Sequence, residues 1–339
     1  MRCESRNGML IDSFGRTLDY MRVSITDRCN LRCFYCMPPE GVEWKPHKDM
    51  LTFEEILRIV RIMADLGVRK IRVTGGEPLL RRGTPSFFEN LKTIPGIERV
   101  TLTTNGLLLG AYLDEACSEG LELPDGVNIS LDALDRERYR SITRCEDADP
   151  EIILPLIDRL LNMSIQVKIN CVPVHSVNEE EIIGLAMLAR DRNISVRFIE
   201  LMALGSAADF QPVSGSEAAA MIEKAYGALI PFSGAVGSGP AVYYSLPGFA
   251  GKIGFINAVT HGFCETCNRL RLTSEGFLKL CLSNDIGLDL KEPIRSGISD
   301  KELIKAIIEA VAKKPGFHTL SKIYDTPKKH PNSMFKIGG

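Results

Sequence analysis

Residues 23–36 read VSITDRCNLRCFYC, a segment of alternating polarity that runs into three closely spaced cysteines. The alternation predicts a strand at Met21–Ile25, and Cys29, Cys33 and Cys36 lie in the loop that follows it. In β/α folds, ligands bind at the carboxyl ends of the strands. Three thiolates at this position suit a [4Fe-4S] cluster in which one iron has no protein ligand. The motif therefore predicts an α/β protein with a reactive iron–sulfur site beside its first strand.

Five further strands are predicted, and amphipathic helices separate them. The six predicted strands are Met21–Ile25, Lys70–Thr74, Val100–Thr104, Gly126–Leu131, Gln166–Val172 and Ser195–Glu200. Helical spacing predicts Thr52–Leu66, with Thr52 as N-cap and Glu55 completing a capping box, and a further helix over Asn178–Asp191. Six β/α units in succession imply a parallel sheet, either open and doubly wound or curled toward a barrel.

Each predicted strand alternates polar with apolar residues, whereas a parallel strand covered on both faces should be almost wholly apolar. A period of two places each polar set on one side of the sheet. The polar positions include Arg22, Ser24, Arg72, Thr74, Thr101, Thr103, Asn128, Ser130, Lys168, Asn170, Ser195 and Arg197. We therefore expect an incomplete (β/α)6 TIM-like barrel with a wide, mostly cationic interior, instead of a closed barrel filled with side chains.

A change of pattern after Tyr226 predicts two domains, residues 1–226 and residues 227–339. Ser233–Pro240 is a glycine-rich connection, because no helical pattern follows it. A last helix is predicted over Asp300–Lys313.

A second group of three cysteines, Cys264, Cys267 and Cys281, brackets a predicted β-hairpin. Residues 269–273 (RLRLT) and 277–282 (FLKLCL) flank a short turn of sequence SEG. Pairing about this turn returns Cys281 to the side of Cys267.

The same pairing divides the hairpin into two faces. Leu270 then lies opposite Leu280, and Leu272 opposite Leu278, which makes one face apolar. The other face carries Arg269, Arg271, Lys279 and Cys281. Two arginines beside three thiolates predict a second open-iron cluster with a cationic rim, suited to a substrate with anionic groups and ring nitrogens.

Composition excludes several classes of protein. The chain has 339 residues and a formal net charge of −2, so its bulk charge gives no reason to expect a nucleic-acid or membrane partner. No apolar run approaches the ~18 residues of a membrane span, and residues 1–10 lack a signal-peptide core. We therefore expect a cytoplasmic protein whose grouped cysteines are metal ligands or redox sites. The scattered cysteines, expected to be buried or incidental thiols, are Cys3, Cys117, Cys145 and Cys171.

The first cysteine group, with Tyr35 before its last cysteine, resembles the radical S-adenosylmethionine (SAM) superfamily. Residues 75–78 (GGEP) are similar to the glycine-rich segment of that superfamily, which pairs with the methionine amine of SAM. From about Phe14 to Gly339 the chain resembles the GTP 3′,8-cyclase (MoaA) family of molybdenum cofactor biosynthesis. The motifs that carry this resemblance are 23–36 (VSITDRCNLRCFYC), 71–80 (IRVTGGEPLL), 103–106 (TTNG), 127–132 (VNISLD), 167–172 (VKINCV), 264–273 (CETCNRLRLT) and the closing Gly-Gly.

The resemblance implies a partial barrel whose mouth is closed by residues 227–339, with two [4Fe-4S] clusters. Their implied ligands are Cys29, Cys33, Cys36, Cys264, Cys267 and Cys281. The implied SAM contacts are Tyr35, Gly76, Ser130 and Met202. The implied GTP contacts are Arg22, Arg72, Thr103, Lys168, Arg269, Arg271 and, through its backbone, Leu270. The implied catalytic residues are Arg269, Arg271, Gly338 and Gly339. The two glycines would thread into the active site, because residues without a Cβ can pass closely there.

The resemblance also implies the reaction. A 5′-deoxyadenosyl radical from SAM would abstract the ribose 3′ hydrogen of GTP, and the ribose radical would attack C8 of guanine. Reduction then gives (8S)-3′,8-cyclo-7,8-dihydroguanosine 5′-triphosphate. The expected partners are GTP, SAM, an electron donor and a downstream cyclic pyranopterin monophosphate synthase, with a homodimer left open and no nucleic acid or membrane.

Two alternatives remain at this point. One is a radical SAM peptide-modifying enzyme, although its auxiliary clusters use longer cysteine arrays. The other is a non-catalytic iron–sulfur or zinc protein. Zinc needs a fourth ligand, and the nearest histidines, His47 and His261, are poorly placed for that role.

Overall fold

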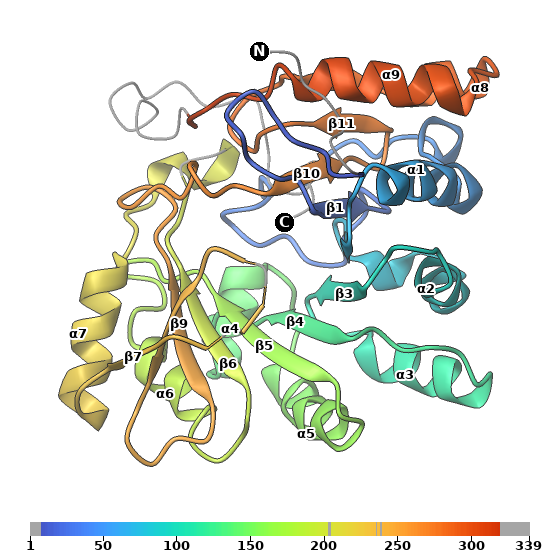
Figure 1. Ribbon diagram of the computed structural model, residues 1–339. Coiled ribbons are helices and arrows are strands. Elements are labelled where there is room, and N and C mark those ends of the chain that lie inside the picture. Colours follow the sequence, from blue (N-terminus) through green and yellow to red (C-terminus); the bar gives the residue numbers. More distant parts are fainter. Residues whose placement is uncertain (1–7, 203–204, 235, 238, 319–339) are drawn as a thin grey trace.

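The computed structural model describes residues 8–202, 205–234, 236–237 and 239–318 of the 339-residue chain. These residues form a 12-stranded sheet in the order β12-β11-β10-β1-β2-β3-β4-β5-β6-β9-β8-β7 (Figure 1). The central strands are β1 (Tyr20–Ser24), β2 (Lys70–Thr74), β3 (Arg99–Thr104), β4 (Gly126–Ser130), β5 (Gln166–Cys171) and β6 (Ser195–Ile199). All six are parallel, and each pairs with the next along the chain. The predicted incomplete (β/α)6 barrel is therefore confirmed, with every strand boundary within one residue of its predicted position.

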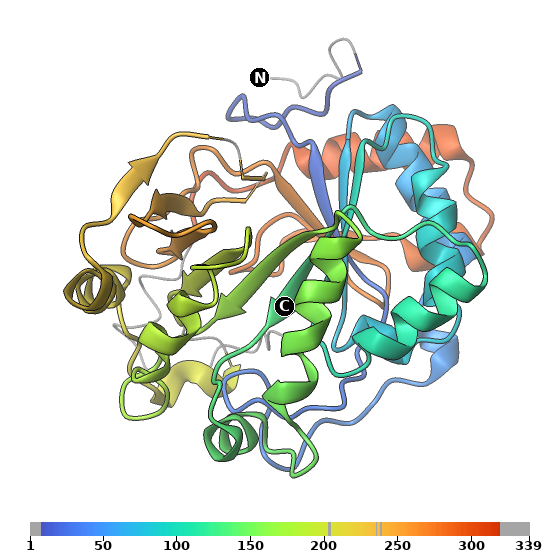
Figure 2. The same cartoon turned by 90° about the horizontal axis from the view of Figure 1, so that it is seen from below.

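Helices lie around the outside of the curved sheet, as the view along it shows (Figure 2). They are α1 (Phe53–Asp65), α2 (Thr84–Lys92), α3 (Leu109–Ser118), α4 (Arg136–Thr143), α5 (Leu154–Asn162), α6 (Glu181–Met187), α7 (Gly215–Tyr226), α8 (Lys291–Arg295) and α9 (Asp300–Val311). Short 3₁₀ helices span His47–Asp49, Pro78–Leu80, Pro150–Ile152 and Gly205–Asp209. Among the described residues, no helix has the length and apolar character needed to cross a bilayer.

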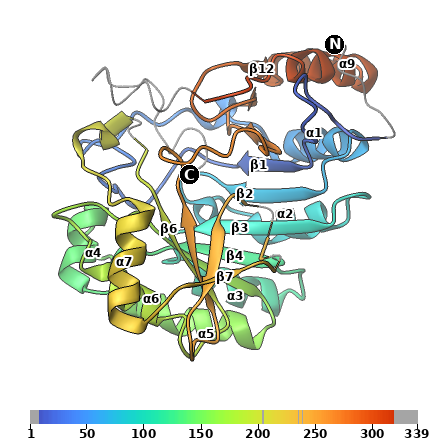
Figure 3. The same ribbon diagram turned by 60° about the vertical axis from the view of Figure 1, so that its left-hand side comes forward.

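Strands from beyond residue 227 extend the barrel sheet at both edges (Figure 3). The outer strands are β7 (Ile230–Phe232), β8 (Val242–Ser245), β9 (Lys252–Ile256), β10 (Arg269–Leu272), β11 (Phe277–Lys279) and β12 (Gly287–Asp289). β9 lies parallel to β6, and β10 lies parallel to β1. The C-terminal part thus shares the barrel's hydrogen bonding, and its division into a separate domain at residue 227 stays a prediction.

The two faces of the strands differ as the alternation predicts. The apolar positions Val23, Val73, Leu102, Ile129 and Ile169 are fully buried in the core beneath the helices. The intervening polar positions face the interior of the barrel. The core therefore lies outside the sheet, and the concave side is free for ligands.

Local signals explain several element boundaries. The Thr52 hydroxyl accepts the Glu55 N–H and the Glu55 carboxylate accepts the Thr52 N–H, so the predicted capping box starts α1. The predicted hairpin is also confirmed, because Arg271 lies opposite Lys279 and Leu272 opposite Leu278.

The helix predicted over Asn178–Asp191 is wrong in its extent, since α6 covers Glu181–Met187 only. Asn178 does not cap α6. Its Oδ1 accepts the Val174 N–H (2.8 Å), and its Nδ2 donates to the carbonyl of Asp132 (2.9 Å). This bonding stabilises a turn before the helix, so the helix begins later.

Candidate active site

The polar interior of the barrel contains a cavity of about 300 Å³ that is open to solvent. The cavity is lined by Cys29, Cys33, Cys36, Cys264, Cys267 and Cys281. The other predicted site residues that line it are Tyr35, Gly76, Ser130, Met202, Arg22, Arg72, Thr103, Arg269 and Arg271. The structure therefore brings both cysteine groups, from distant parts of the chain, to one space.

The first cysteine loop is a compact turn beyond β1. The N–H groups of Cys36 and Met37 both donate to the carbonyl of Cys33, at 2.8 and 3.0 Å. Burial raises the pKa of the Cys29 thiol to about 11 and raises that of Cys33 well above its usual value. Thiols buried without a cation keep their protons, and a bound metal centre supplies the positive charge that releases them. The donor set fits an iron–sulfur cluster.

The backbone of the glycine segment, residues 75–78, lies directly against the backbone of the loop. The Gly76 N–H donates to the carbonyl of Thr26 (2.8 Å), and the Glu77 N–H donates to that of Arg28 (2.7 Å). A Cβ on Gly76 would lie 2.3 Å from the Arg28 oxygen, so no other residue fits without displacing the loop. Since its N–H is engaged, only the carbonyl oxygen of Gly76 is left to bind a ligand, and the SAM contact expected of this residue stays a prediction.

Asp132 joins the cysteine loop to the end of β4. Its Oδ2 accepts the Tyr35 hydroxyl, and its Oδ1 accepts the Val172 N–H (2.8 Å). Burial raises the pKa of Asp132 to about 6, although both hydrogen bonds act in the opposite direction. The ring of Tyr35 is thereby fixed at the wall of the cavity.

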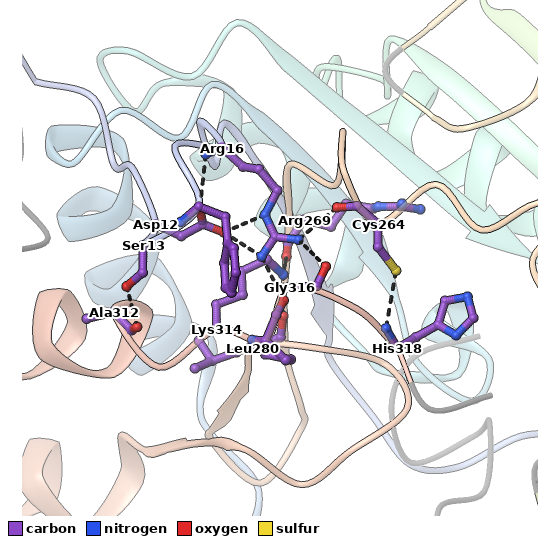
Figure 4. A network of polar contacts seen from close by, with 12 residues as sticks. Asp12, Ser13, Arg16, Cys264, Arg269, Leu280, Ala312, Lys314, Gly316 and His318 are labelled. Carbon is purple, nitrogen blue, oxygen red and sulfur yellow. Dashed lines mark hydrogen bonds and ion pairs between the residues drawn. The ribbon is translucent and has the colours of Figure 1, made fainter. Parts of the chain in front are cut away.

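The second cysteine group flanks the β10–β11 hairpin, with Cys264 and Cys267 before β10 and Cys281 after β11, and Figure 4 shows the surroundings of Cys264. The Cys267 N–H donates to the carbonyl of Cys264 (3.2 Å), and the His318 N–H donates to the Cys264 sulfur (3.3 Å). Burial acts to raise the pKa of Cys267, but the cations of Lys314 and Arg269 outweigh it, so this pKa lies below its usual value. The cations favour the thiolate, which is the form that binds iron.

The spacing of the ligands also bears on which metal centre fits. Within the described ranges, no three histidine, cysteine, aspartate or glutamate side chains converge as they do around a single metal ion. The choice between zinc and an iron–sulfur cluster at the two cysteine groups stays a prediction.

Three arginines stand side by side across three neighbouring strands. Arg22 in β1 is in register with Arg271 in β10 and with Arg72 in β2. Burial and the neighbouring Arg269 lower the pKa of Arg271 to about 10. Like charges on adjacent strands repel, and a bound anion relieves that repulsion. The row is therefore suited to a polyanionic ligand.

The buried polar atoms of the cavity wall that lack a hydrogen-bond partner among the described residues include the Thr103 Oγ1 and the Arg271 Nη1. Buried polar atoms in native proteins are nearly always paired. Because both residues line the cavity, their unpaired atoms indicate where a ligand supplies the missing partners.

Lys168 does not line this cavity. It lies in a small adjoining pocket of about 20 Å³, with Arg72 and Arg99, and its Nζ donates to the carbonyl of Val236. Burial, then Arg197, Arg72 and Arg99, lower the pKa of Lys168 to about 7. Arg72 lines both spaces, so the pockets adjoin, and the GTP contact expected of Lys168 stays a prediction.

The remaining predicted residues divide into three cases. Leu270 is fully buried opposite Met21, so only its backbone could contact a ligand. Met202 is half-buried at the cavity. Gly338, Gly339 and Cys3 lie outside the described residues. Of the other scattered cysteines, Cys171 is buried, Cys145 is half-buried and Cys117 is exposed.

Several lining residues were not assigned roles from the sequence, among them Asp132, Asn170, Arg197, Lys314 and His318. The first three follow the polar alternation of the strands, so that pattern contained the signal. Lys314 and His318 follow α9 in a segment without a motif. Only the packing of this segment against the hairpin identifies them.

Two protein families match this chain. The Radical SAM superfamily matches residues 23–189, which cover the end of β1, the strands β2 to β5 and the first cysteine group. The family described as Molybdenum Cofactor Synthesis C matches residues 194–320, which include the second cysteine group.

Proteins named GTP 3′,8-cyclase align with this chain over nearly their whole length. A GTP 3′,8-cyclase of Clostridium perfringens (strain 13 / Type A) is 43% identical over 329 residues, which cover 97% of this chain and 99% of that protein. A GTP 3′,8-cyclase of Thermodesulfovibrio yellowstonii is 44% identical over 308 residues, 90% of this chain and 94% of that protein.

Solved structures share the fold at low sequence identity. Streptococcus suis SuiB bound to S-adenosylmethionine matches with a TM-score of 0.61 and 14% identity, over 88% of this chain and 69% of SuiB. The AdoMet-bound structure of anSMEcpe matches with a TM-score of 0.52 and 13% identity, over 93% of this chain and 90% of that one. At such identities the likeness shows the fold alone.

Proposed function

The chain belongs to the GTP 3′,8-cyclase family of the radical SAM superfamily, and from this membership we infer that it converts GTP to (8S)-3′,8-cyclo-7,8-dihydroguanosine 5′-triphosphate. The reaction is a lyase-type radical SAM reaction and the first step of molybdenum cofactor biosynthesis. Membership replaces the two earlier alternatives, the peptide-modifying enzyme and the non-catalytic metal protein.

The row of arginines supports this function most directly. Arg22, Arg72 and Arg271 lie side by side on the wall of a cavity that both cysteine groups reach. A triphosphate offers these guanidinium groups several anionic oxygens. The unpaired Thr103 Oγ1 and Arg271 Nη1 supply two further donors for GTP. Arg269 and the backbone of Leu270 complete the proposed GTP contacts, with Lys168 in the adjoining pocket.

The first cysteine group would hold the cluster on which SAM cleavage depends. Cys29, Cys33 and Cys36 would be its ligands, and a bound [4Fe-4S] cluster would supply the electron for the reductive cleavage of SAM. The chain's own part is to orient SAM. We assign this to the Gly76 carbonyl and the side chain of Tyr35, which Asp132 holds in place, with Ser130 and Met202 beside them. Fixed orientation places the reactive carbon against the ribose and keeps side reactions low.

A second [4Fe-4S] cluster is part of the proposal. Cys264, Cys267 and Cys281 would hold it, leaving one iron for a lone pair of the guanine. Support comes from their position on the same cavity and from the cations that favour the Cys267 thiolate. Arg269 and Arg271, beside these cysteines, would keep the substrate's charge near the reacting ribose.

Other parts of the proposal concern the surroundings of the enzyme. An electron donor would reduce the first cluster, and a cyclic pyranopterin monophosphate synthase would consume the product. Residues 227–339 would form a C-terminal domain over the barrel mouth, with Gly338 and Gly339 entering the site. A cytoplasmic location and a homodimer stay predictions.

The proposed function can be tested directly under anaerobic conditions. Reconstituted, reduced protein is incubated with SAM, with and without GTP, and the nucleosides are identified by mass spectrometry. We expect 5′-deoxyadenosine together with a cyclised nucleotide of unchanged GTP mass. Deoxyadenosine without a GTP product would contradict the substrate, and intact clusters without SAM cleavage would contradict the radical chemistry.

A further inference from the structure

Lys314 is a lysine on the segment after α9, and only 3% of its surface is exposed. Its Nζ donates to the carbonyl oxygens of Arg269, at 3.0 Å, and of Leu280 (Figure 4). No carboxylate in the described part of the chain forms an ion pair with it. A buried ammonium without a carboxylate is costly unless other negative charge faces it.

The second cysteine group would supply that negative charge once it holds a cluster. Burial lowers the pKa of Lys314, and the nearby Cys267 and Cys281 act in the opposite direction. The Asp12 carboxylate is already paired with Arg16, at 2.6 Å. Lys314 also lines the cavity that contains both cysteines.

Arg16 holds the segment that carries Lys314 in place. Its guanidinium donates to the carbonyls of Cys264 (2.7 Å), Pro315 (2.8 Å) and Gly316 (3.1 Å). The turn before β1 is thereby fastened both to the cysteine loop and to the residues directly after Lys314 (Figure 4). The position of the Lys314 charge relative to the cysteines is thus set by the fold.

We propose that Lys314 is a positioning residue of the second cysteine site, which holds the hairpin carbonyls of Arg269 and Leu280 together and sets a fixed positive charge against the cluster bound there. The proposal rests on the second cluster of the proposed function. Reduction adds one electron to a cluster and makes it more negative, so a nearby cation stabilises the reduced form. The charge of Lys314 therefore raises the reduction potential of the second cluster, since net charge and hydrogen bonding set such potentials.

The test separates charge from hydrogen bonding. Lys314→Gln keeps a side chain that donates to the two carbonyls and removes the charge, whereas Lys314→Arg keeps the charge. Lys313→Gln, at the neighbouring exposed lysine, is the matched control. The full chain is reconstituted anaerobically, with Cys29, Cys33 and Cys36 replaced by alanine so that the iron signals come from the second site alone. Iron per chain is counted, and the cluster is titrated with a one-electron reductant and followed by electron paramagnetic resonance.

We expect Lys314→Gln to keep its iron. Its equilibrium constant for reduction of the cluster should fall at least tenfold, which corresponds to a shift of about 59 mV to more negative reduction potential. Lys314→Arg and Lys313→Gln should match the parent chain. An unchanged potential in iron-loaded Lys314→Gln overturns the proposal. If Lys314→Gln loses its iron while Lys314→Arg keeps it, the result supports the role of the charge. If both variants lose their iron, the proposal is overturned.

The parent chain separates this proposal from the proposed function. A parent that binds no iron at the second site overturns the role of Lys314 and the second cluster together. The formation of a cyclised GTP product by the unmodified protein is measured independently, so the two failures are distinguishable.

Discussion

The Tyr35 hydroxyl lies 2.5 Å from Oδ2 of Asp132, so the first cysteine loop is fastened to the strand end on the far side of the barrel mouth. Asp132 is fully buried and also accepts the Val172 N–H. One carboxylate thereby links the loop after β1 to the ends of β4 and β5.

Tyr35→Phe tests this link. Removing the hydroxyl leaves one oxygen of buried Asp132 without that donor, which should lower the free energy of unfolding by about 1–3 kcal/mol. Anaerobic chemical denaturation measures the loss, and SAM affinity should fall as the ring loses its anchor. Tyr226→Phe is the control, since that hydroxyl bonds the carbonyl of Ile183 at an exposed position. Equal effects of the two variants would contradict the prediction.

Gly76→Ala should disrupt the first cluster site. The new Cβ would lie 2.3 Å from the Arg28 carbonyl oxygen, directly before Cys29, so the loop must move. We expect about half of the iron to be lost and SAM cleavage to stop, as iron analysis and product assays will show. Gly110→Ala is the control, because its Cβ would meet only Leu156, at 3.6 Å, within a helix that favours alanine. Full iron content in Gly76→Ala would refute the steric argument.

Arg271→Ala should weaken GTP binding and leave SAM binding unchanged. A charge-assisted hydrogen bond to a phosphate contributes about 1.5–3 kcal/mol, which corresponds to roughly a 10- to 100-fold loss of affinity. Isothermal titration with each ligand separates the two effects. Arg61→Ala, at an exposed position on α1, controls for the change in net charge. Equal losses for SAM and GTP would show that Arg271 does not distinguish the two subsites.

Glu77 makes stability depend on pH. Burial raises its pKa to about 7, although its oxygens accept hydrogen bonds from Asn105, Leu79 and Thr104. Because the folded state holds this proton more tightly, the contribution of Glu77 to stability is complete below pH 4.5 and is lost as pH rises to about 7. The slope amounts to about 1.4 kcal/mol per pH unit.

Glu77→Gln should therefore flatten the stability profile between pH 5 and 7, roughly the interval between the unfolded and folded pKa values. A glutamine side chain accepts hydrogen bonds through its oxygen alone, whereas both oxygens of Glu77 accept them. The variant should therefore also be less stable at pH 5 by about 1–3 kcal/mol. Denaturation curves at pH 5, 6 and 7 for both proteins give the difference. Parallel profiles would mean that Glu77 is ionised throughout this range.

The parts of the fold that follow from local pattern could be predicted. The barrel strands alternate so regularly that their bounds were predicted within one residue. The register of the hairpin followed from its turn, where Gly276 adopts φ +91. The two cysteine groups and the wall containing Arg22, Arg72 and Thr103 followed from the same patterns.

Other features depend on contacts that no local pattern encodes. The pairing of β10 with β1 joins segments far apart in the chain, and their sequences contain no sign of each other. Asn178 matched an N-cap, but its side chain bonds to Val174 and Asp132. The alternation of its strand predicted that Lys168 faces the barrel interior, but the loop containing Val236 covers this side chain. Each outcome was decided by tertiary contacts that compete with local preference.

The placement of β9 and β10 at the two edges of the barrel sheet has a consequence for how the chain is made. Asp19 bonds Asn268, 249 residues later, where β10 begins its pairing with β1. At about 5–20 residues per second, a ribosome needs tens of seconds to complete that interval. During this time β1 presents an unpaired edge, which is prone to aggregate with other chains. We therefore expect the nascent barrel to depend on chaperones until its edge strands emerge.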